Sequence, residues 1–218
     1  MRLRPILLIA ALIAATLLAG CASLERDARE AVLAQLPSPP GTTFSDLERY
    51  PGDVLCGRYT ATDLQGFRVE THDFIYSGGV AYRRPSARER ALFCTREPAA
   101  ALQQELGLGP WEAGTGTLGQ VYRDLRSLTD AIAAHMAATG DVPLGGLAEL
   151  APPAGNYLDA LPLDPWGNAY HFEVGLGGRT QRDYRLFTLG ADNSPGGTGD
   201  AADVGREHLP YLDRLARL

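Results

Sequence analysis

Apolar residues recur at helical spacing in two parts of the chain. The longer stretch places Leu118, Val121, Leu125, Leu128, Ile132 and Met136 on one face of a helix that ends at Gly140. The shorter stretch predicts a helix from Ala22 to Leu36, which Pro37 ends. Between them, a brief helix from Ala99 to Leu106 lies in a glycine-containing stretch over residues 98–116, which we interpret as a linker.

Short strands are predicted elsewhere. One group lies within residues 42–97: Val54–Thr60, Phe67–Tyr76 as one strand or two, Val80–Arg83 after a turn at 77–79, and Arg90–Cys94. A second group is His171–Val174, a glycine-rich hairpin over 175–178, and Asp183–Leu189. The tail, residues 209–218, has the pattern of a short amphipathic helix that docks on its own domain.

The N-terminus has the pattern of an export signal. Two arginines precede an apolar run from Pro5 to Leu18, which is short for a membrane-spanning helix. The run ends in Leu18-Ala19-Gly20-Cys21, which resembles the bacterial lipobox and implies cleavage after residue 20 and lipidation of Cys21. The alternative is an ordinary signal peptide with a chance cysteine. By the lipoprotein sorting rule, Ala22 implies anchoring in the outer membrane, with the folded part in the periplasm and residues 21–41 as tether and short helix.

Cys56 and Cys94 are the two remaining cysteines. An even pair in an oxidising compartment predicts a disulfide within the small β-rich module. A reactive or metal-binding pair is the alternative, and no C-x-x-C spacing supports it.

Composition excludes several classes of protein. The 218 residues are 45% hydrophobic and carry a net charge of -6, which is typical of a globular chain and argues against a nucleic-acid partner. Neither G-x-S-x-G, H-E-x-x-H nor a P-loop occurs, so we expect no enzyme activity. His72 and Asp73 are adjacent in a predicted strand and so point to opposite faces. His135, beside the apolar face of the long helix, is expected to be a packing or surface residue.

Three acidic residues lie in a glycine-rich run that follows the last predicted strand. Asp192, Asp200 and Asp203, with main-chain carbonyls nearby, are oxygen ligands of the kind that Ca²⁺ prefers. On composition alone, a solvated acidic loop with Asx-turns is an equal alternative.

Two motifs in this half occur in order: Leu161-Pro162-x-Asp164-Pro165-Trp166-Gly167-Asn168-x-Tyr170, then Leu189-Gly190-Ala191-Asp192 with Gly196-Gly197-x-Gly199-x-x-Ala202-Asp203. Together they resemble the major pseudopilin of type II secretion systems. The resemblance implies a long helix packed on a three-stranded antiparallel sheet, over residues 117–218. It implies one calcium ion, with Asp192, Asp200 and Asp203 as side-chain ligands and the carbonyls of Leu189, Ser194 and Gly197 as further ligands. Trp166 is expected to be a packing anchor, and Asp164 and Asn168 to tie a turn.

The chain also departs from that family. No prepilin motif, Gly-Phe with a glutamate five residues on, precedes the long helix, so we do not expect it to polymerise as a core pilin. The sequence predicts an α+β chain in which a disulfide-stapled antiparallel β meander precedes the pseudopilin-like domain. We expect a calcium-binding outer-membrane lipoprotein that serves a secretion or pilus apparatus as accessory or adaptor. The alternatives are a free-standing envelope binding module with structural calcium, and a hydrolase activity hidden in the N-terminal module.

Overall fold

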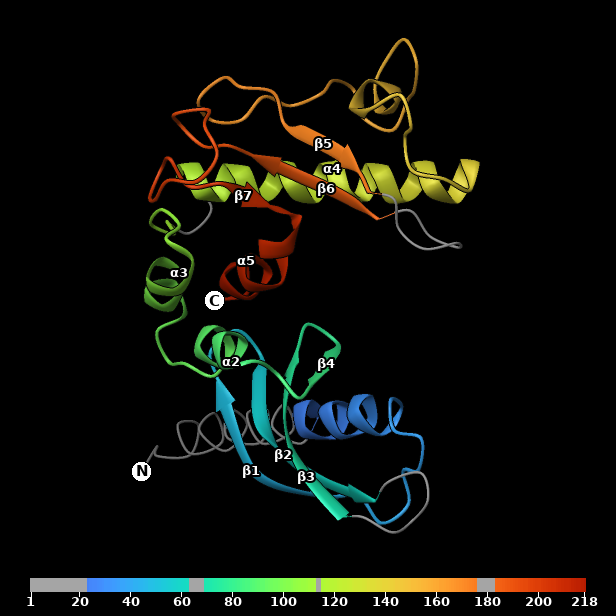
Figure 1. Cartoon of the computed structure of the whole chain (residues 1–218), viewed down its shortest axis with the longest axis vertical. Helices are drawn as coiled ribbons and strands as arrows, with labels where there is room; N and C mark the ends of the chain where they lie inside the picture. The colour runs from blue at the N-terminus through green and yellow to red at the C-terminus, as the bar shows by residue number, and fades with distance from the viewer. Residues whose placement is uncertain (1–22, 63–68, 113–114, 176–182) are drawn as a thin grey trace, which may run out of the picture. The chain divides into compact units, whose positions relative to one another are not determined.

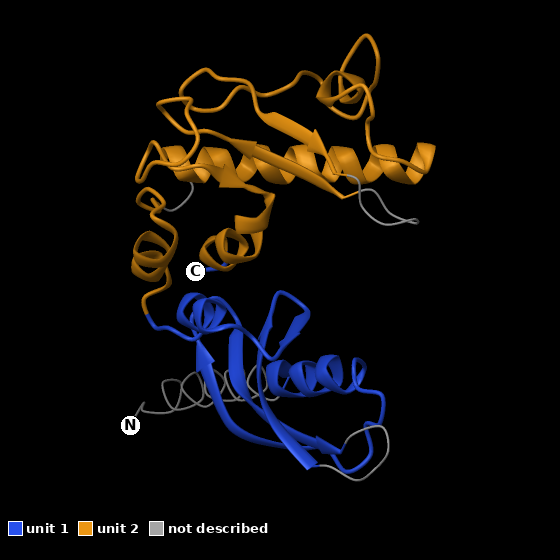
Figure 2. Ribbon diagram, viewed as in Figure 1, with its two compact units in different colours: residues 1–96, 217–218 blue, residues 97–216 orange. Residues whose placement is uncertain are grey.

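The chain folds into two compact α+β units. A computed structural model describes residues 23–62, 69–112, 115–175 and 183–218. Unit 1 contains residues up to Arg96 together with Arg217–Leu218, and unit 2 contains Glu97–Ala216 (Figure 2). Residues 98–116, which were expected to be a linker, therefore belong to unit 2. Cys21, expected to be lipidated, lies outside the described residues.

Unit 1 is built on a four-stranded antiparallel sheet in the order β1-β2-β3-β4 (Figure 1). Its strands are β1 (Thr43–Tyr50), β2 (Val54–Thr62), β3 (Val69–Ser77) and β4 (Val80–Arg83). Each strand pairs with the next along the chain, and tight turns at 51–53 and 78–79 join β1 to β2 and β3 to β4. The predicted antiparallel meander is thus confirmed, with β1 as an additional strand.

A helix over residues 23–33 covers this sheet. Its fully buried Ala28 and Val32, four residues apart, lie on one helical face. They pack against Leu55 of β2 and Phe74 of β3 in a single apolar cluster. The periodicity that predicted this helix therefore also identified its buried face.

The segment Arg90–Cys94, expected to be a strand, instead forms the end of a helix and the residue that follows it. The helix α2 (Ala87–Phe93) begins with a capping box, in which the Ser86 hydroxyl accepts from the Glu89 N–H at 3.1 Å and the Glu89 carboxylate accepts from the Ser86 N–H at 2.7 Å. Reciprocal capping satisfies two otherwise unpaired backbone donors and so favours a helix here.

The predicted disulfide is present. Cys94, the residue that follows α2, is bonded to Cys56 in β2, with the two Cα atoms 6.0 Å apart. The bond closes a loop of 38 positions, and constraint of the unfolded chain by such a loop contributes about 4 kcal/mol to stability. The disulfide therefore fastens α2 to the sheet of a small unit whose apolar core is limited.

Unit 2 places a long helix against a three-stranded antiparallel sheet (Figure 1). The helix is α4 (Thr117–Thr139), and the sheet order is β5 (His171–Val174), β6 (Tyr184–Thr188) and β7 (Val204–Gly205). Gly140 ends α4 in the left-handed conformation, as its position in the sequence predicted. The predicted hairpin over 175–178 falls largely on residues 176–182, outside the described ranges.

Shorter helices complete unit 2: α3 (Pro98–Leu106), η1 (Leu147–Leu150), η2 (Arg206–His208) and α5 (Leu209–Ala216). Leu125 of α4, Leu186 of β6 and Leu212 of α5 are fully buried in one shared core. The tail helix α5 therefore docks on its own domain, as predicted. No helix in the described part of the chain is long and apolar enough to cross a membrane.

Candidate functional site

A buried aspartate organises the turn that leads into the sheet of unit 2. Asp164 is only 3% exposed, and its Oδ1 accepts hydrogen bonds from the N–H groups of Trp166 (3.1 Å) and Asn168 (2.7 Å). Its Oδ2 accepts from the Thr188 hydroxyl of β6 at 2.5 Å. A buried carboxylate is stable only when its oxygens are paired in this way. The expectation that Asp164 ties the turn is confirmed, and Trp166 packs against the core as predicted.

The same turn reaches the glycine-rich segment that follows β6. The Asn168 side-chain amide donates to the Gly190 carbonyl at 3.4 Å, and the Gly190 N–H donates to the Thr188 hydroxyl at 3.1 Å. Gly190 has a φ of +71°, and a Cβ there would lie 2.7 Å from the Asp200 carbonyl oxygen. We call residues 189–204 the acidic loop. Only glycine at position 190 allows the two ends of this loop to approach so closely.

Each predicted acidic ligand already accepts one hydrogen bond. Asp192 accepts from the Ser194 N–H at 3.1 Å, Asp200 from the Thr117 hydroxyl at 3.2 Å, and Asp203 from the Gly196 N–H at 3.0 Å. The first of these is the Asx-turn expected of a solvated acidic loop. Over residues 23–62, 69–112, 115–175 and 183–218, no three His, Cys, Asp or Glu side chains are grouped so that they could hold a metal ion. Side chains alone therefore do not form a metal site in the acidic loop.

One oxygen in the loop lacks a hydrogen-bond donor. The Oδ1 atom of Asp203 is buried, and it has no hydrogen-bond partner among the described residues. A buried, unpaired carboxylate oxygen costs about 1–3 kcal/mol or more, which a bound cation offsets. Around it the backbone is tightly folded, since a Cβ on Gly197 would lie 2.3 Å from the Ala201 carbonyl oxygen. Carboxylate and carbonyl oxygens are the donors that Ca²⁺ takes, so the residues present fit that ion chemically.

A partly buried acidic group of α4, Asp124, contacts the residue that ends the Asp164 turn. The Tyr170 hydroxyl donates to Asp124 of α4 at 3.0 Å. Burial raises the pKa of the Asp124 carboxyl, while the hydrogen bond from Tyr170 lowers it in part. Burial, with the negative charge of Asp124 nearby, also raises the pKa of Tyr170 well above its ordinary value. This pair joins α4 to the end of the Asp164 turn.

The structure also places His135 and Glu149 together, which the sequence did not predict. They line a pocket of about 760 Å³ with Thr139, Ala154, Gly155, Asn156 and Tyr157. His135 lies in α4 and Glu149 in η1, so only the fold brings them together. A histidine beside the apolar face of a predicted helix was the sole signal for this pocket in the sequence.

The other histidines lie in separate places in the structure. His208 accepts a hydrogen bond from the Gly205 N–H at 3.0 Å, and His171 stacks on Phe187 with ring centroids 5.1 Å apart. His72 lies beside Glu70, at 3.1 Å, and Arg84. His72 and Asp73 are neighbours on β3 that pair with different residues of β2, Tyr59 and Arg58 respectively.

Comparison with known proteins shows that most of unit 2 is similar in sequence to one family. The family described as type II secretion system (T2SS), protein G, matches residues 116–207. Type II secretion system core protein G of Pseudomonas aeruginosa is 45% identical over 49 residues, which is 22% of this chain and 32% of that protein. The core protein G of Vibrio cholerae is 47% identical over 55 residues, 25% of this chain and 36% of that protein. The chain thus spans about a third of the length of these relatives, and its C-terminal part is pseudopilin-like.

Proposed function

We propose that this chain is a non-catalytic, lipid-anchored envelope protein that serves a type II secretion or pilus-like apparatus as an accessory or adaptor, through unit 2. The observation that carries the proposal is the match of residues 116–207 to the protein G family, over a helix and sheet with the family's expected arrangement. Similarity of this domain to a subunit of such an apparatus is our reason for proposing contact between them.

The proposal assigns unit 2 a role other than that of a fibre core subunit. In this chain α4 follows a separate folded unit and α3, and no prepilin motif precedes it. The apolar face of α4, including Leu118, Val121 and Leu128, is already buried in the core of unit 2. A partner must therefore be met by the exposed surface of the unit.

We further propose that Ca²⁺ binds in the acidic loop and stabilises it. Asp203 is the central ligand in this proposal, because its buried Oδ1 lacks a partner among the described residues. Asp192 and Asp200 and the carbonyls of Leu189, Ser194 and Gly197 are the further ligands that the resemblance implies. When bound, the ion supplies positive charge among these oxygens and holds the two ends of the loop together. In this proposal the ion stabilises the folded loop. Any partner that binds next to the loop would therefore bind less well without the ion.

The anchor is proposed from the sequence alone. Leu18-Ala19-Gly20-Cys21 supports lipidation of Cys21 and retention at the outer membrane facing the periplasm. Several acyl chains on one cysteine give stable anchoring, because each buried methylene contributes ~0.8 kcal/mol. Metabolic labelling with palmitate tests this: the chain should carry label, and Cys21→Ser should abolish it. Unlabelled wild-type chain would remove the anchor from the proposal.

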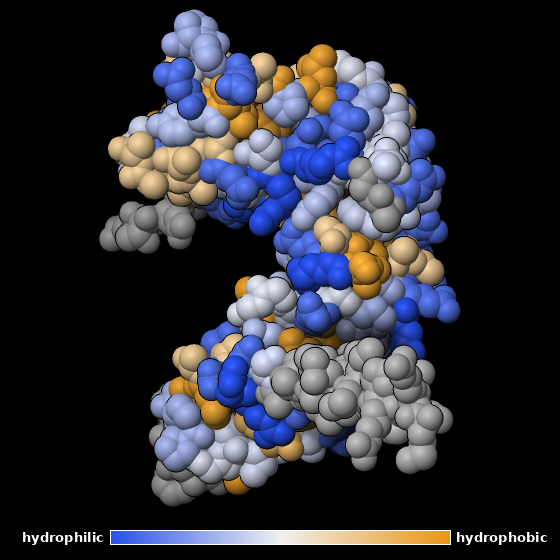
Figure 3. Space-filling model, turned by 180° about the vertical axis from the view of Figure 1, so that it is seen from behind, coloured by the Kyte–Doolittle hydropathy of each residue, from blue (hydrophilic) through white to orange (hydrophobic). Residues whose placement is uncertain are grey.

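The adaptor role is tested by photo-crosslinking in the host cell. Leu163, 56% exposed in unit 2, is replaced by a photoreactive amino acid, and Val80, 50% exposed in unit 1, serves as the matched control. Hydrophobic side chains on the face visible in Figure 3 form small patches among hydrophilic ones, so single exposed aliphatic positions are suitable probes. We expect crosslinks from position 163 to a pseudopilin or another apparatus component, and none from position 80. If neither position gives such a crosslink and deletion of the gene leaves secretion unchanged, the chain is a free-standing envelope module.

A further inference from the structure

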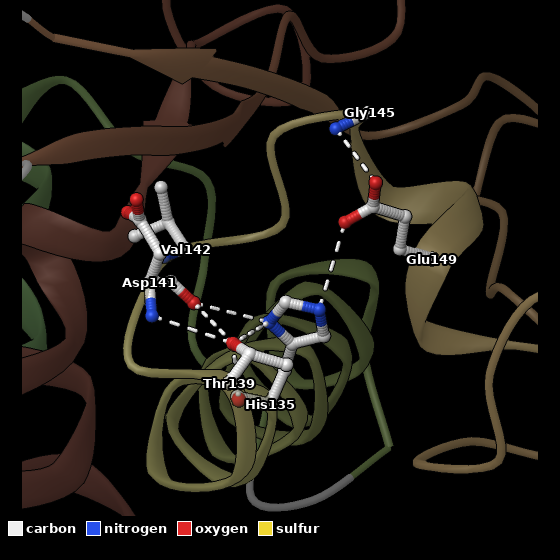
Figure 4. Close-up of polar contacts among 6 residues, drawn as sticks. All are labelled: His135, Thr139, Asp141, Val142, Gly145 and Glu149. Carbon is white, nitrogen blue, oxygen red and sulfur yellow. Dashed lines mark hydrogen bonds and ion pairs between the residues drawn. The ribbon is translucent and has the colours of Figure 1, made fainter.

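A polar pocket lies at the C-terminal end of α4, where residues 145–157 fold back over the helix. It has a volume of about 760 Å³. Figure 4 shows His135 reaching from α4 toward Glu149 of η1, with Gly145 on the far side of the glutamate.

The ring of His135 is held in one orientation. The residue is 8% exposed, and its Nδ1 lies 3.1 Å from the main-chain carbonyl oxygen of Asp141. The Thr139 hydroxyl also lies 3.3 Å from Nδ1. Because the Asp141 carbonyl can only accept, a hydrogen bond to it places a proton on Nδ1, and a ring with that single proton carries its lone pair on Nε2. The ring also makes a T-shaped contact with Tyr157, with ring centroids 5.5 Å apart. Nε2 is thereby directed toward Glu149.

The carboxylate of Glu149 is held as well. Its Oε1 accepts from the Gly145 N–H at 2.9 Å, which leaves Oε2 3.5 Å from His135 Nε2. A Cβ on Gly145 would lie 2.5 Å from Oε1, so the approach depends on glycine. With the ring proton on Nδ1, the lone pair of Nε2 faces the carboxylate oxygen Oε2 across the pocket.

This arrangement has the geometry of a metal-binding pair. An imidazole nitrogen and a carboxylate oxygen that share one tetrahedral Zn²⁺ lie about 3.4 Å apart. Metal-binding histidines usually donate their other N–H to a carbonyl or carboxylate, as His135 does to Asp141. Imidazole with carboxylate selects transition metals such as Zn²⁺, whereas Ca²⁺ takes oxygen ligands.

We propose that His135 Nε2 and Glu149 Oε2 bind a divalent transition-metal ion, with Zn²⁺ as the representative, and that water in the pocket completes its coordination. The ion links the end of α4 to η1 and so secures residues 141–157, where η1 is the only helix or strand that the structure describes. The site is separate from the acidic loop and uses a different class of metal. The alternative is that His135 and Glu149 share a proton in a direct hydrogen bond, with no metal ion between them.

Calorimetric titration of the purified chain with ZnCl₂, at neutral pH and in millimolar Ca²⁺, tests the proposal. Glu149→Gln keeps an oxygen for the Gly145 N–H but removes the charge, and His135→Gln removes the imidazole. We expect each variant to weaken Zn²⁺ binding at least 10- to 100-fold, as ligand-shell changes do. The exposed His171 is the matched control, and His171→Gln should leave the affinity unchanged.

Two further measurements keep the outcome decisive. Melting temperatures without zinc show whether a variant is folded, and imidazole nitrogen NMR of the wild type follows His135 directly. Zinc should shift the Nε2 resonance of His135 and slow hydrogen exchange over residues 141–157. Unchanged affinity in folded Glu149→Gln, or a Nε2 resonance that stays protonated with zinc present, would show that the pair shares a proton and overturn the proposal.

Discussion

Replacement of Asp164 by asparagine is expected to destabilise unit 2 strongly. The Asp164 carboxylate accepts from two backbone N–H groups, at 3.1 and 2.7 Å, and from the Thr188 hydroxyl at 2.5 Å. Asparagine has one acceptor oxygen in place of two, so it can accept either the two backbone bonds or the hydroxyl bond. The bonds that it keeps are also weaker, because the amide is uncharged. Hydrogen bonds to charged groups contribute about 1.5–3 kcal/mol and neutral ones about 1 kcal/mol. Weakening of two bonds and loss of the third should together cost about 2.5–7 kcal/mol.

Urea unfolding followed by tryptophan fluorescence measures this cost, because Trp166 is part of the turn. The matched control is Asp159→Asn, which removes the same charge from an exposed position five residues earlier. A surface change of this kind usually lies within about 0.5 kcal/mol of wild type. Equal midpoints and slopes for the two variants would show that the Asp164 hydrogen bonds do not hold the turn.

Three other perturbations follow from the structure. Reduction of the chain, or Cys56→Ser with Cys94→Ser, should lower the unfolding free energy of unit 1 by about 4 kcal/mol in denaturant titrations, and a loss below about 1 kcal/mol would contradict the stapling role. Gly190→Ala should lower the melting temperature more than Gly140→Ala, because both have positive φ but a Cβ would meet backbone at 2.7 Å only at position 190. Because burial raises the pKa of Asp124 above 3.8, the folded state binds more protons than the unfolded one just above that pH. The stability of the wild type should therefore fall relative to Asp124→Asn as pH rises from about 4, and parallel pH profiles would refute this.

The elements that the sequence predicted correctly have strong local signals. The α4 helix combines six apolar residues at helical spacing with Gly140 at its end, and the helix over 23–33 ends before Pro37. Asp164 could be assigned to its turn because side-chain-to-backbone bonds of this type span only a few residues. Local patterns of this kind determine both the element and the residue that ends it.

The errors arose where local patterns compete. Arg90–Cys94 contains adjacent apolar residues that suit a buried strand, but the capping box formed by Ser86 and Glu89 selects a helix. The strand β1 was missed because much of it is exposed and its register is interrupted between Ser45 and Glu48, so it lacks clear alternation. In both cases the deciding contacts lie outside the short apolar run that was considered.

The candidate sites differ in how far the sequence could predict them. The acidic loop is one continuous segment, so its residues could be named, but only the folded chain shows that Asp203 has a buried oxygen without a partner among the described residues. The pocket of His135 joins residues from α4, η1 and the segment 154–157, which come together only through tertiary packing. Contacts of that kind cannot be predicted from a local pattern along the sequence.

Unit 2 is pseudopilin-like, and our central proposal is that its acidic loop binds Ca²⁺. Thermal unfolding with Ca²⁺, with Mg²⁺ and with EDTA, for wild type and Asp203→Asn, tests it most directly, with Asp159→Asn as control. Binding to the native state alone adds about 2.7 kcal/mol at a hundredfold excess over Kd, which for a unit of this size raises the melting temperature on the order of 10 °C. We predict such a rise for wild type and the control with Ca²⁺ only, and its loss in Asp203→Asn. Equal melting temperatures of the wild type in Ca²⁺ and in EDTA would contradict the claim and leave the acidic loop a solvated turn.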